Sequence, residues 1–179
     1  PQEGIFRIKQ QDTPANITFA TKDDISHFES LIAGDDHIPS YLRLGLPYEN
    51  KKKQLIVART KPYLYKKSLR ENISLWKKAQ SAEDYEEFYT ISRILGFKDL
   101  ELDKSLSVSS LLPEELYYLG IARALWCNPK YIVICEPNGD ANVSIDSLIS
   151  RISPYCHDRE IGLLYLSTTQ SKSDFSSVI

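Results

Sequence analysis

The feature that most constrains this sequence is an unbroken apolar run, YIVIC at Tyr131–Cys135, which lies between an Asn-Pro turn and a Glu-Pro turn. An uninterrupted apolar run is typical of a strand buried on both faces, because a half-exposed strand alternates apolar and polar residues. Similar runs occur at residues 17–21, 54–58 and 163–167. Strands covered on both faces belong to sheets flanked by helices, so these runs predict an α/β fold with a mostly parallel sheet.

Segments with helical spacing of apolar residues separate the predicted strands. Residues 25–34 have apolar side chains at 25, 28, 31 and 32 and end at a glycine. Residues 81–95 begin with Ser81, a suitable N-cap, and continue with an apolar stripe. Further helices are predicted at Pro113–Trp126, which opens with proline and two glutamates, and at residues 146–152.

The composition excludes several classes of protein. The net charge of −2 argues against a dedicated nucleic-acid binder, which would be distinctly basic. The cysteines Cys127, Cys135 and Cys156 are odd in number and lack a CxxC pair, which indicates reduced thiols rather than disulfides or a zinc site. No apolar run has the length of a membrane span. The 179 residues suit one domain, and the absence of methionine suggests a piece of a longer chain.

The most specific pattern lies at residues 119–137, which read LGIARAL, then an Asn-Pro turn, then YIVICEP. This stretch resembles the part of ABC-transporter ATPases that leads from the signature helix into the Walker B strand. Residues 61–73, KPYLYKKSLRENI, resemble the region after the Q-loop in exporter-type members. The resemblance implies a P-loop-NTPase-like core at about residues 1–73 and 113–179, with a small helical subdomain at about residues 74–112.

Aligned on these two segments, the sequence supplies a residue for each nucleotide-contacting position of the family. Residues 19–26, FATKDDIS, fall on the Walker A phosphate loop, and Glu136 falls on the catalytic glutamate of Walker B. The other nucleotide-site equivalents are Asp24, Ile25 and Ser26 in the phosphate loop, Thr60 at the Q-loop glutamine, Cys135 at the Walker B aspartate and Thr169 at the switch histidine. The signature equivalents are Leu112, Pro113, Glu114 and Glu115.

Most of these positions lack the chemical group that ATP hydrolysis needs. A phosphate loop needs glycines, a lysine and a hydroxyl, whereas here Ile25 takes the lysine position and Asp23 and Asp24 would face phosphate oxygens. A plain strand-to-helix connection, with acidic residues at the helix N-terminus, is the simpler interpretation. The thiol of Cys135 is a poor partner for hydrated Mg²⁺. Glu136 then has neither metal nor phosphate to act on, and we expect it to be an idle carboxylate.

These losses predict a pseudo-ATPase. ATP sites of the family pair the Walker A motif of one subunit with the signature of the other, and this chain lacks both halves. The leading hypothesis is a degenerate nucleotide-binding domain with a structural or regulatory role in a transporter, at the cytoplasmic face of the membrane. It needs no cofactor, and its expected partners are a transmembrane domain and a second nucleotide-binding domain, identical or different, but not nucleic acid.

Two questions stay open from the sequence. Tyr63, Leu64 and Tyr65 lie where family members meet the membrane domain, and they either dock there or pack against the helix at residues 81–95. The chain as a whole has two alternative functions. It is a weak ATPase that binds Mg-ATP through a phosphate loop in another register, or it is an interaction module unrelated to transport.

Overall fold

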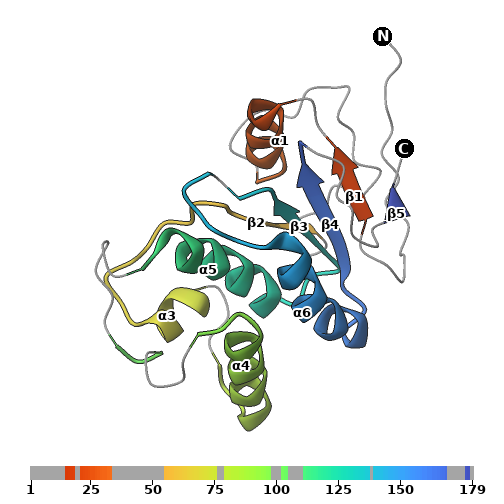
Figure 1. Ribbon diagram of the computed structural model, residues 1–179. Helices are drawn as coiled ribbons and strands as arrows, with labels where there is room; N and C mark the ends of the chain where they lie inside the picture. Colours follow the sequence, from red (N-terminus) through yellow and green to blue (C-terminus); the bar gives the residue numbers. More distant parts are fainter. Residues whose placement is uncertain are drawn as a thin grey trace.

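The computed structural model describes residues 15–18, 21–33, 55–75, 79–97, 102–104, 111–137, 139–168 and 176–177. Its strands form one five-stranded sheet in the order β2-β3-β4-β1-β5, and every pairing is parallel, which confirms the predicted α/β class (Figure 1). The strands are β1 (Ala15–Thr18), β2 (Leu55–Ala58), β3 (Tyr131–Cys135), β4 (Gly162–Ser167) and β5 (Ser176–Ser177). The helices are α1 (Lys22–Ala33), α3 (Leu69–Ile73), α4 (Ala82–Ile94), α5 (Pro113–Trp126) and α6 (Ile145–Asp158).

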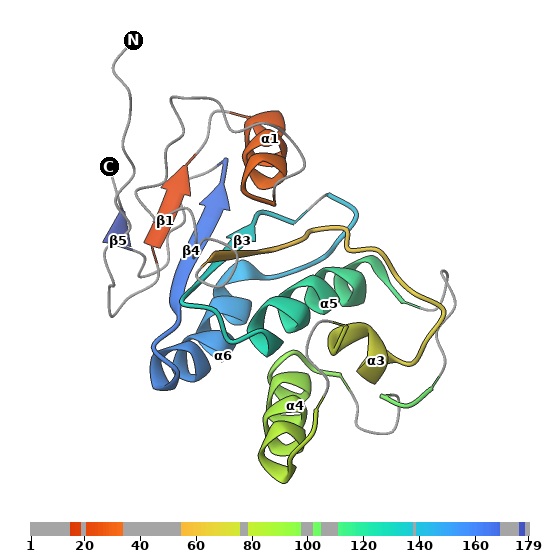
Figure 2. The ribbon, with the colours of Figure 1, turned by 180° about the vertical axis from the view of Figure 1, so that it is seen from behind.

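Strand β3 is apolar throughout because both of its faces are covered. Tyr131, Val133 and Cys135 belong to a cluster that α1 completes with Ile25 and Phe28. The alternate residues of β3 belong to a larger cluster formed with the apolar sides of α3, α4, α5 and α6. Figures 1 and 2 show α5 and α6 side by side along the sheet, with α4 farthest from the strands. The sheet is therefore a middle layer, as the continuous apolar run predicts.

Two polar clusters fasten α4 to its neighbours. Arg70 of α3 donates to Asp103 from two nitrogens, at 2.7 and 3.1 Å, and its guanidinium lies over the rings of Phe88 and Tyr89. Glu87 of α4 accepts hydrogen bonds from the Tyr155 hydroxyl at 2.8 Å and from Arg159 at 2.7 Å. These contacts join α4 to α3 on one side and to the end of α6 on the other.

Some of the predicted bounds are confirmed and others are wrong. β3 and α5 have the predicted ends, and Ser81 is the N-cap of α4 as expected. β1 lies earlier than the predicted residues 17–21, and α1 begins at Lys22, before the predicted 25. α6 runs past the predicted residue 152 to Asp158, through Pro154, because its buried face continues. The short helix α3 was not predicted, although Ser68 and Glu71 form a capping box there.

The helices in the described part of the chain are all too short or too polar to cross a lipid bilayer.

Gly120 marks the closest approach of α5 to the chain beyond β2. A Cβ atom at this position would lie 2.1 Å from the carbonyl oxygen of Arg59. We expect Gly120→Ala to lower the free energy of unfolding by about 2 kcal/mol or more, because backbone must move, even though alanine is ordinarily the better helix former. Urea unfolding measures the loss. Gly139→Ala is the matched control, since nothing lies within 4 Å of its added Cβ, and equal effects of the two variants would contradict this packing.

Candidate functional site

The carboxyl ends of the parallel strands meet at one edge of the sheet, which is where ligands bind in parallel α/β folds. The register pairs Ala58 with Ile134, Cys135 with Leu166, and Thr18 with Ser167. The residues that follow these strands therefore share the edge with the N-terminus of α1. Thr60 follows β2 by two residues and Glu136 follows β3 directly, so both belong to this edge.

Glu136 is the centre of the polar contacts at this edge. Its Oε2 accepts hydrogen bonds from the backbone N–H of Thr168 at 2.8 Å and from the Thr168 hydroxyl at 2.7 Å. Its Oε1 lies 3.6 Å from the Nζ of Lys22, at the start of α1. Burial by itself raises the pKa of Glu136, but the Thr168 hydrogen bonds and the Lys22 charge outweigh it and hold the pKa below its ordinary value. The carboxylate is ionised and both oxygens have partners.

The N-terminus of α1 is closed by its own side chains. The backbone N–H and hydroxyl of Thr21 donate to Oδ2 of Asp24, at 3.0 and 2.8 Å, and the N–H of Asp24 donates back to the Thr21 hydroxyl at 3.2 Å. This is the reciprocal pattern of a capping box. Asp24 is thus placed as a capping residue, which agrees with the plain strand-to-helix interpretation of this segment.

The other two phosphate-loop equivalents, Ile25 and Ser26, lie on different sides of α1, one buried and one exposed. Ile25, at the expected lysine position, is buried in the apolar cluster beneath α1, in company with Phe28 and Cys135. Ser26 lies exposed within α1. Strand β1 ends at Thr18 and α1 begins at Lys22, so only residues 19–21 separate them. Of these, residues 19 and 20 lie outside the described part of the chain.

Cys135, the Walker B aspartate equivalent, is the last residue of β3 and is buried. Its side chain packs in the apolar cluster under α1, and its carbonyl oxygen accepts a hydrogen bond from the Tyr117 hydroxyl at 2.7 Å. The next backbone N–H, that of Glu136, donates to Leu166 at 2.7 Å. Within the described ranges, no group of three or more His, Cys, Asp or Glu side chains is arranged to hold a metal ion.

The N-terminus of α5, at the signature equivalents, also has an internal acidic cap. The backbone N–H of Leu112 donates to Oε2 of Glu115 at 2.8 Å. Leu112 is 58% exposed, Pro113 is the first residue of the helix, and Glu114 is half-buried. The switch equivalent Thr169 lies outside the described residues.

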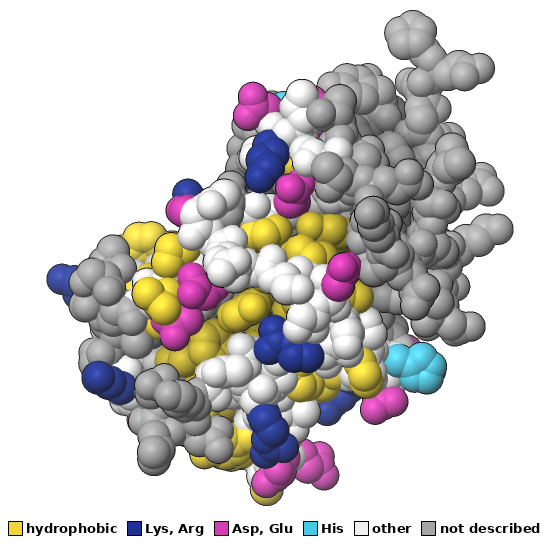
Figure 3. Space-filling view, in the orientation of Figure 1, with side chains coloured by type: hydrophobic (Ala, Val, Ile, Leu, Met, Phe, Trp, Pro, Cys, Tyr) yellow, Lys and Arg dark blue, Asp and Glu magenta, His cyan; other side chains and the backbone are white. Residues whose placement is uncertain are grey.

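The three residues predicted to dock on a membrane domain, Tyr63, Leu64 and Tyr65, lie on two faces of the extended segment after β2. Tyr63 is 72% exposed and lies edge-to-face with Tyr65, their ring centroids 4.7 Å apart. Leu64 points the opposite way and is only 8% exposed, so its assignment to a docking surface was wrong. Figure 3 shows hydrophobic side chains, interspersed with acidic ones, at the surface where α3 and the start of α5 lie.

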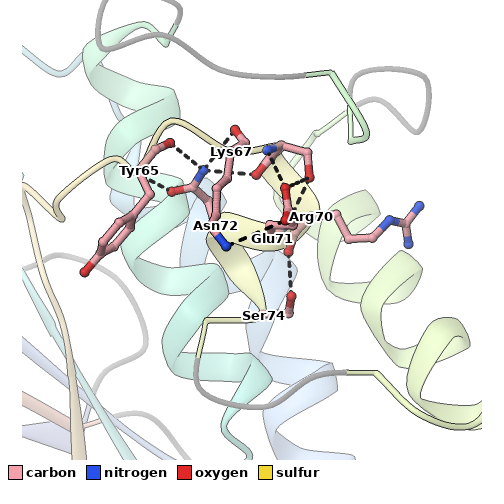
Figure 4. A network of polar contacts seen from close by, with 7 residues as sticks. Tyr65, Lys67, Arg70, Glu71, Asn72 and Ser74 are labelled. Atoms are coloured by element: carbon pink, nitrogen blue, oxygen red, sulfur yellow. Dashed lines mark hydrogen bonds and ion pairs between the residues drawn. The ribbon is translucent and has the colours of Figure 1, made fainter.

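The side chain of Asn72 holds the backbone of this segment through several hydrogen bonds (Figure 4). The Asn72 amide donates to the carbonyl oxygens of Tyr65, Lys67 and Ser68 at 3.0, 3.2 and 3.0 Å, and its oxygen accepts from the Tyr65 N–H at 2.9 Å. The buried Arg123 of α5 donates to the backbone oxygen of Asn72 at 2.7 Å and to its side-chain oxygen at 3.0 Å. Burial lowers the pKa of Arg123. The arginine of the LGIARAL stretch therefore holds Asn72, which in turn holds the backbone of Tyr65.

Two residues of the site escaped the sequence analysis as contacts of Glu136. Lys22 lies within residues 19–26, the phosphate-loop equivalent, and Thr168 precedes Thr169, the switch equivalent. The signal that could have found them is topological: both follow strands that end at the same edge, β1 and β4.

The chain has the fold of ATP-binding subunits of ABC transporters. It is similar to the dimeric post-hydrolysis structure of the ATP-binding cassette MJ0796 bound to ADP and Pi, with a TM-score of 0.61, 16% identity, and coverage of 91% of this chain and 77% of that one. It is also similar to the structure of an ATP-binding subunit of an ABC transporter, with a TM-score of 0.62, 19% identity, and coverage of 88% and 68%. No protein-family model and no curated sequence matches it. A shared fold alone does not fix the function.

The lowered pKa of Glu136 predicts a pH-dependent contribution to stability. A carboxyl group whose pKa is lower in the folded state stabilises fully above its unfolded pKa, and this contribution is lost as the pH falls through the folded value. We expect Glu136→Gln to lower the unfolding free energy at pH 7 by about 1–2 kcal/mol, because the charge-assisted hydrogen bonds weaken. The difference between the two proteins should shrink below the ordinary value of 4.5. Thermal unfolding from pH 3 to 8 tests this, and a difference independent of pH would contradict it.

Asn72→Ala should lower the free energy of unfolding by about 2–4 kcal/mol, because it removes one of the two acceptors of Arg123 and the acceptor of the Tyr65 N–H, while the backbone oxygen of residue 72 still accepts from Arg123. Chemical denaturation in urea measures the change. Asn142→Ala, at an exposed position, is the control and should stay within about 0.5 kcal/mol of the parent protein. A loss of the same size in both variants would show that the Asn72 network contributes nothing specific.

Proposed function

We propose that this chain is a nucleotide-binding domain of the ABC-transporter type in which ATP hydrolysis has been lost, and that it serves a structural or regulatory role in a transporter. The observation that carries the proposal is the acidic cap at the N-terminus of α1, where Thr21 and Asp24 engage each other's N–H groups. A phosphate loop binds phosphate through free backbone N–H groups at such a helix end. Here Asp24 accepts the Thr21 N–H, and its negative charge repels a second anion at the same place.

The chemistry of the neighbouring positions supports the same conclusion. Mg²⁺ needs oxygen ligands or water held by carboxylates, and the last position of β3 offers the thiol of Cys135. A catalytic glutamate must be available to orient the attacking water. Glu136 instead holds Thr168 with one oxygen and lies beside Lys22 with the other.

The same reasoning applies to the start of α5, which would complete the nucleotide site of a second subunit. In a dimer of the family's type, this helix end would face the nucleotide bound by the other subunit. Glu115 covers the Leu112 N–H with a carboxylate, so an incoming phosphate would meet an anion there too. We infer that neither composite site of such a dimer hydrolyses ATP.

Tyr63 and Tyr65 supply a surface for the membrane-spanning partner. Both rings are exposed, while the backbone of Tyr65 is held by Asn72. A preorganised aromatic pair costs little conformational entropy on binding and suits a protein interface. In this proposal the core comprises about residues 1–73 and 113–179, the helical subdomain about residues 74–112, and the module acts at the cytoplasmic face of the membrane.

One observation favours a second candidate, a weak ATP-binding subunit. Lys22 is the first residue of α1, and the lysine of a phosphate loop likewise opens the helix that follows it. In this register Lys22, rather than Ile25, would meet the phosphates, provided that it releases Glu136. Binding would then require the Lys22 ammonium.

Calorimetric titration with Mg·ATP separates the two candidates. We expect no binding tighter than about 1 mM, because phosphate would have to displace Asp24 and Glu136 from their partners. Lys22→Ala should leave the titration unchanged. Binding tighter than about 0.1 mM that Lys22→Ala abolishes would contradict the pseudo-ATPase and establish the weak ATP-binding subunit.

Membrane fractionation separates a transporter subunit from an unrelated interaction module. The native protein should sediment with membranes, and Tyr63→Ala combined with Tyr65→Ala should release it while leaving thermal stability within about 2 °C. Tyr85→Ala, at another exposed ring, is the control. Native protein that stays in the supernatant would favour the module without a transporter.

A further inference from the structure

The Glu136 carboxylate is held as a bound anion is held in a binding site. Its contacts come from two segments other than its own: the backbone N–H and hydroxyl of Thr168 after β4, and the ammonium of Lys22 at the start of α1. We propose that Lys22 and Thr168 form an anion-binding cradle which the protein fills with its own Glu136 side chain, and which takes up a small carboxylate when that side chain is removed. The inference rests on the proposed function in one respect: no nucleotide binds to Lys22 and Thr168 in place of the Glu136 carboxylate.

The cradle is fixed independently of its occupant. Strand β4 pairs with β3 on one side and with β1 on the other, so the Thr168 N–H follows a strand that is held on both edges. Lys22 is the first residue of a helix whose N-terminus is closed by Thr21 and Asp24. Removing Glu136 therefore leaves the Thr168 N–H near its present position and leaves the half-exposed Lys22 side chain, anchored at the start of α1, within reach of an anion that binds there.

The surroundings favour a carboxylate as the replacement ligand. Two donors converge on one oxygen of Glu136 and the cation lies by the other, which suits a planar group with two oxygens. The side chain of Glu136 is 21% exposed, so a small solute can reach the position from water. Asp24 lies next to the cradle, but its carboxylate is engaged by Thr21.

Chemical rescue of Glu136→Ala tests the cradle. We expect this variant to lose about 5 °C in melting temperature, because the charge-assisted contacts disappear. Sodium acetate at about 0.2 M should restore at least half of the loss, since its carboxylate enters the space that the side chain left. Sodium chloride at the same concentration should restore none of it. Glu136→Gln fills the same space with an amide, so acetate should not stabilise it.

Matched variants show whether the effect belongs to this site. Glu86→Ala removes an exposed carboxylate on α4 and should be neither destabilised nor stabilised by acetate. The double variant Lys22→Ala/Glu136→Ala should lose the rescue, because the cation of the cradle is gone. Equal responses to acetate and chloride, rescue that persists without Lys22, or stabilisation of the parent protein by acetate would each overturn the proposal.

A double-mutant cycle keeps the proposal testable if Glu136→Ala does not fold. Glu136→Gln keeps the size of the side chain and Lys22→Ala shortens a half-exposed one, and we expect Glu136→Gln to cost at most half as much melting temperature in the Lys22→Ala background. Equal costs in both backgrounds would overturn the cradle. Stabilisation of the parent protein by Mg·ATP would instead overturn the proposed function while leaving the acetate result readable.

Discussion

The sheet edge depends above all on β3, which lies in parallel register between β2 and β4 with apolar side chains on both faces. Burial on both faces fixes its position, since a shift by one residue would exchange the side chains that face α1 and α5. The hydrogen bond from the Glu136 N–H to Leu166 then sets where the chain leaves the strand. The Glu136 side chain extends from this point to Thr168 and Lys22. The register of the strands therefore sets the distances from the carboxylate to both residues.

A second constraint is that four of the described helices have an N-terminus capped by an acidic side chain from their own first turn, whereas α6 is capped by the Ser144 hydroxyl. Asp24 does this for α1, Glu71 for α3, Asp84 for α4 and Glu115 for α5. Such caps stabilise a helix by satisfying N–H groups that have no partner within it. They also place a negative charge beside the N–H groups with which a helix end binds phosphate. At α1 and α5, an acidic cap that stabilises the helix therefore disfavours the binding of a phosphate at the same helix end. The observed hydrogen bonds are those of the cap.

The sequence was sufficient for the elements that burial alone defines. β3 has its predicted bounds because every residue in it is buried, and α5 because it opens with Pro113 and stays buried from Leu119 to Trp126. In an extended segment the side chains of Tyr63, Leu64 and Tyr65 must alternate between two faces, but the sequence does not say which face is buried, because all three are apolar enough for either. Packing against the core decides that Leu64 is buried and the two tyrosines are exposed. Thr168 could not be singled out from its residue type, because its role comes from the register of β4 beside β3.

The most direct test of the account is residue-resolved NMR of two amide groups, those of Asp24 and Thr168, with and without millimolar Mg·ATP. Both amides donate to side chains of the protein itself, so the account predicts slow hydrogen exchange and unchanged chemical shifts on addition of nucleotide. Fast exchange in the absence of ligand, together with saturable shifts of both amides on adding Mg·ATP, would show that the edge is an open phosphate site and would contradict the central claim.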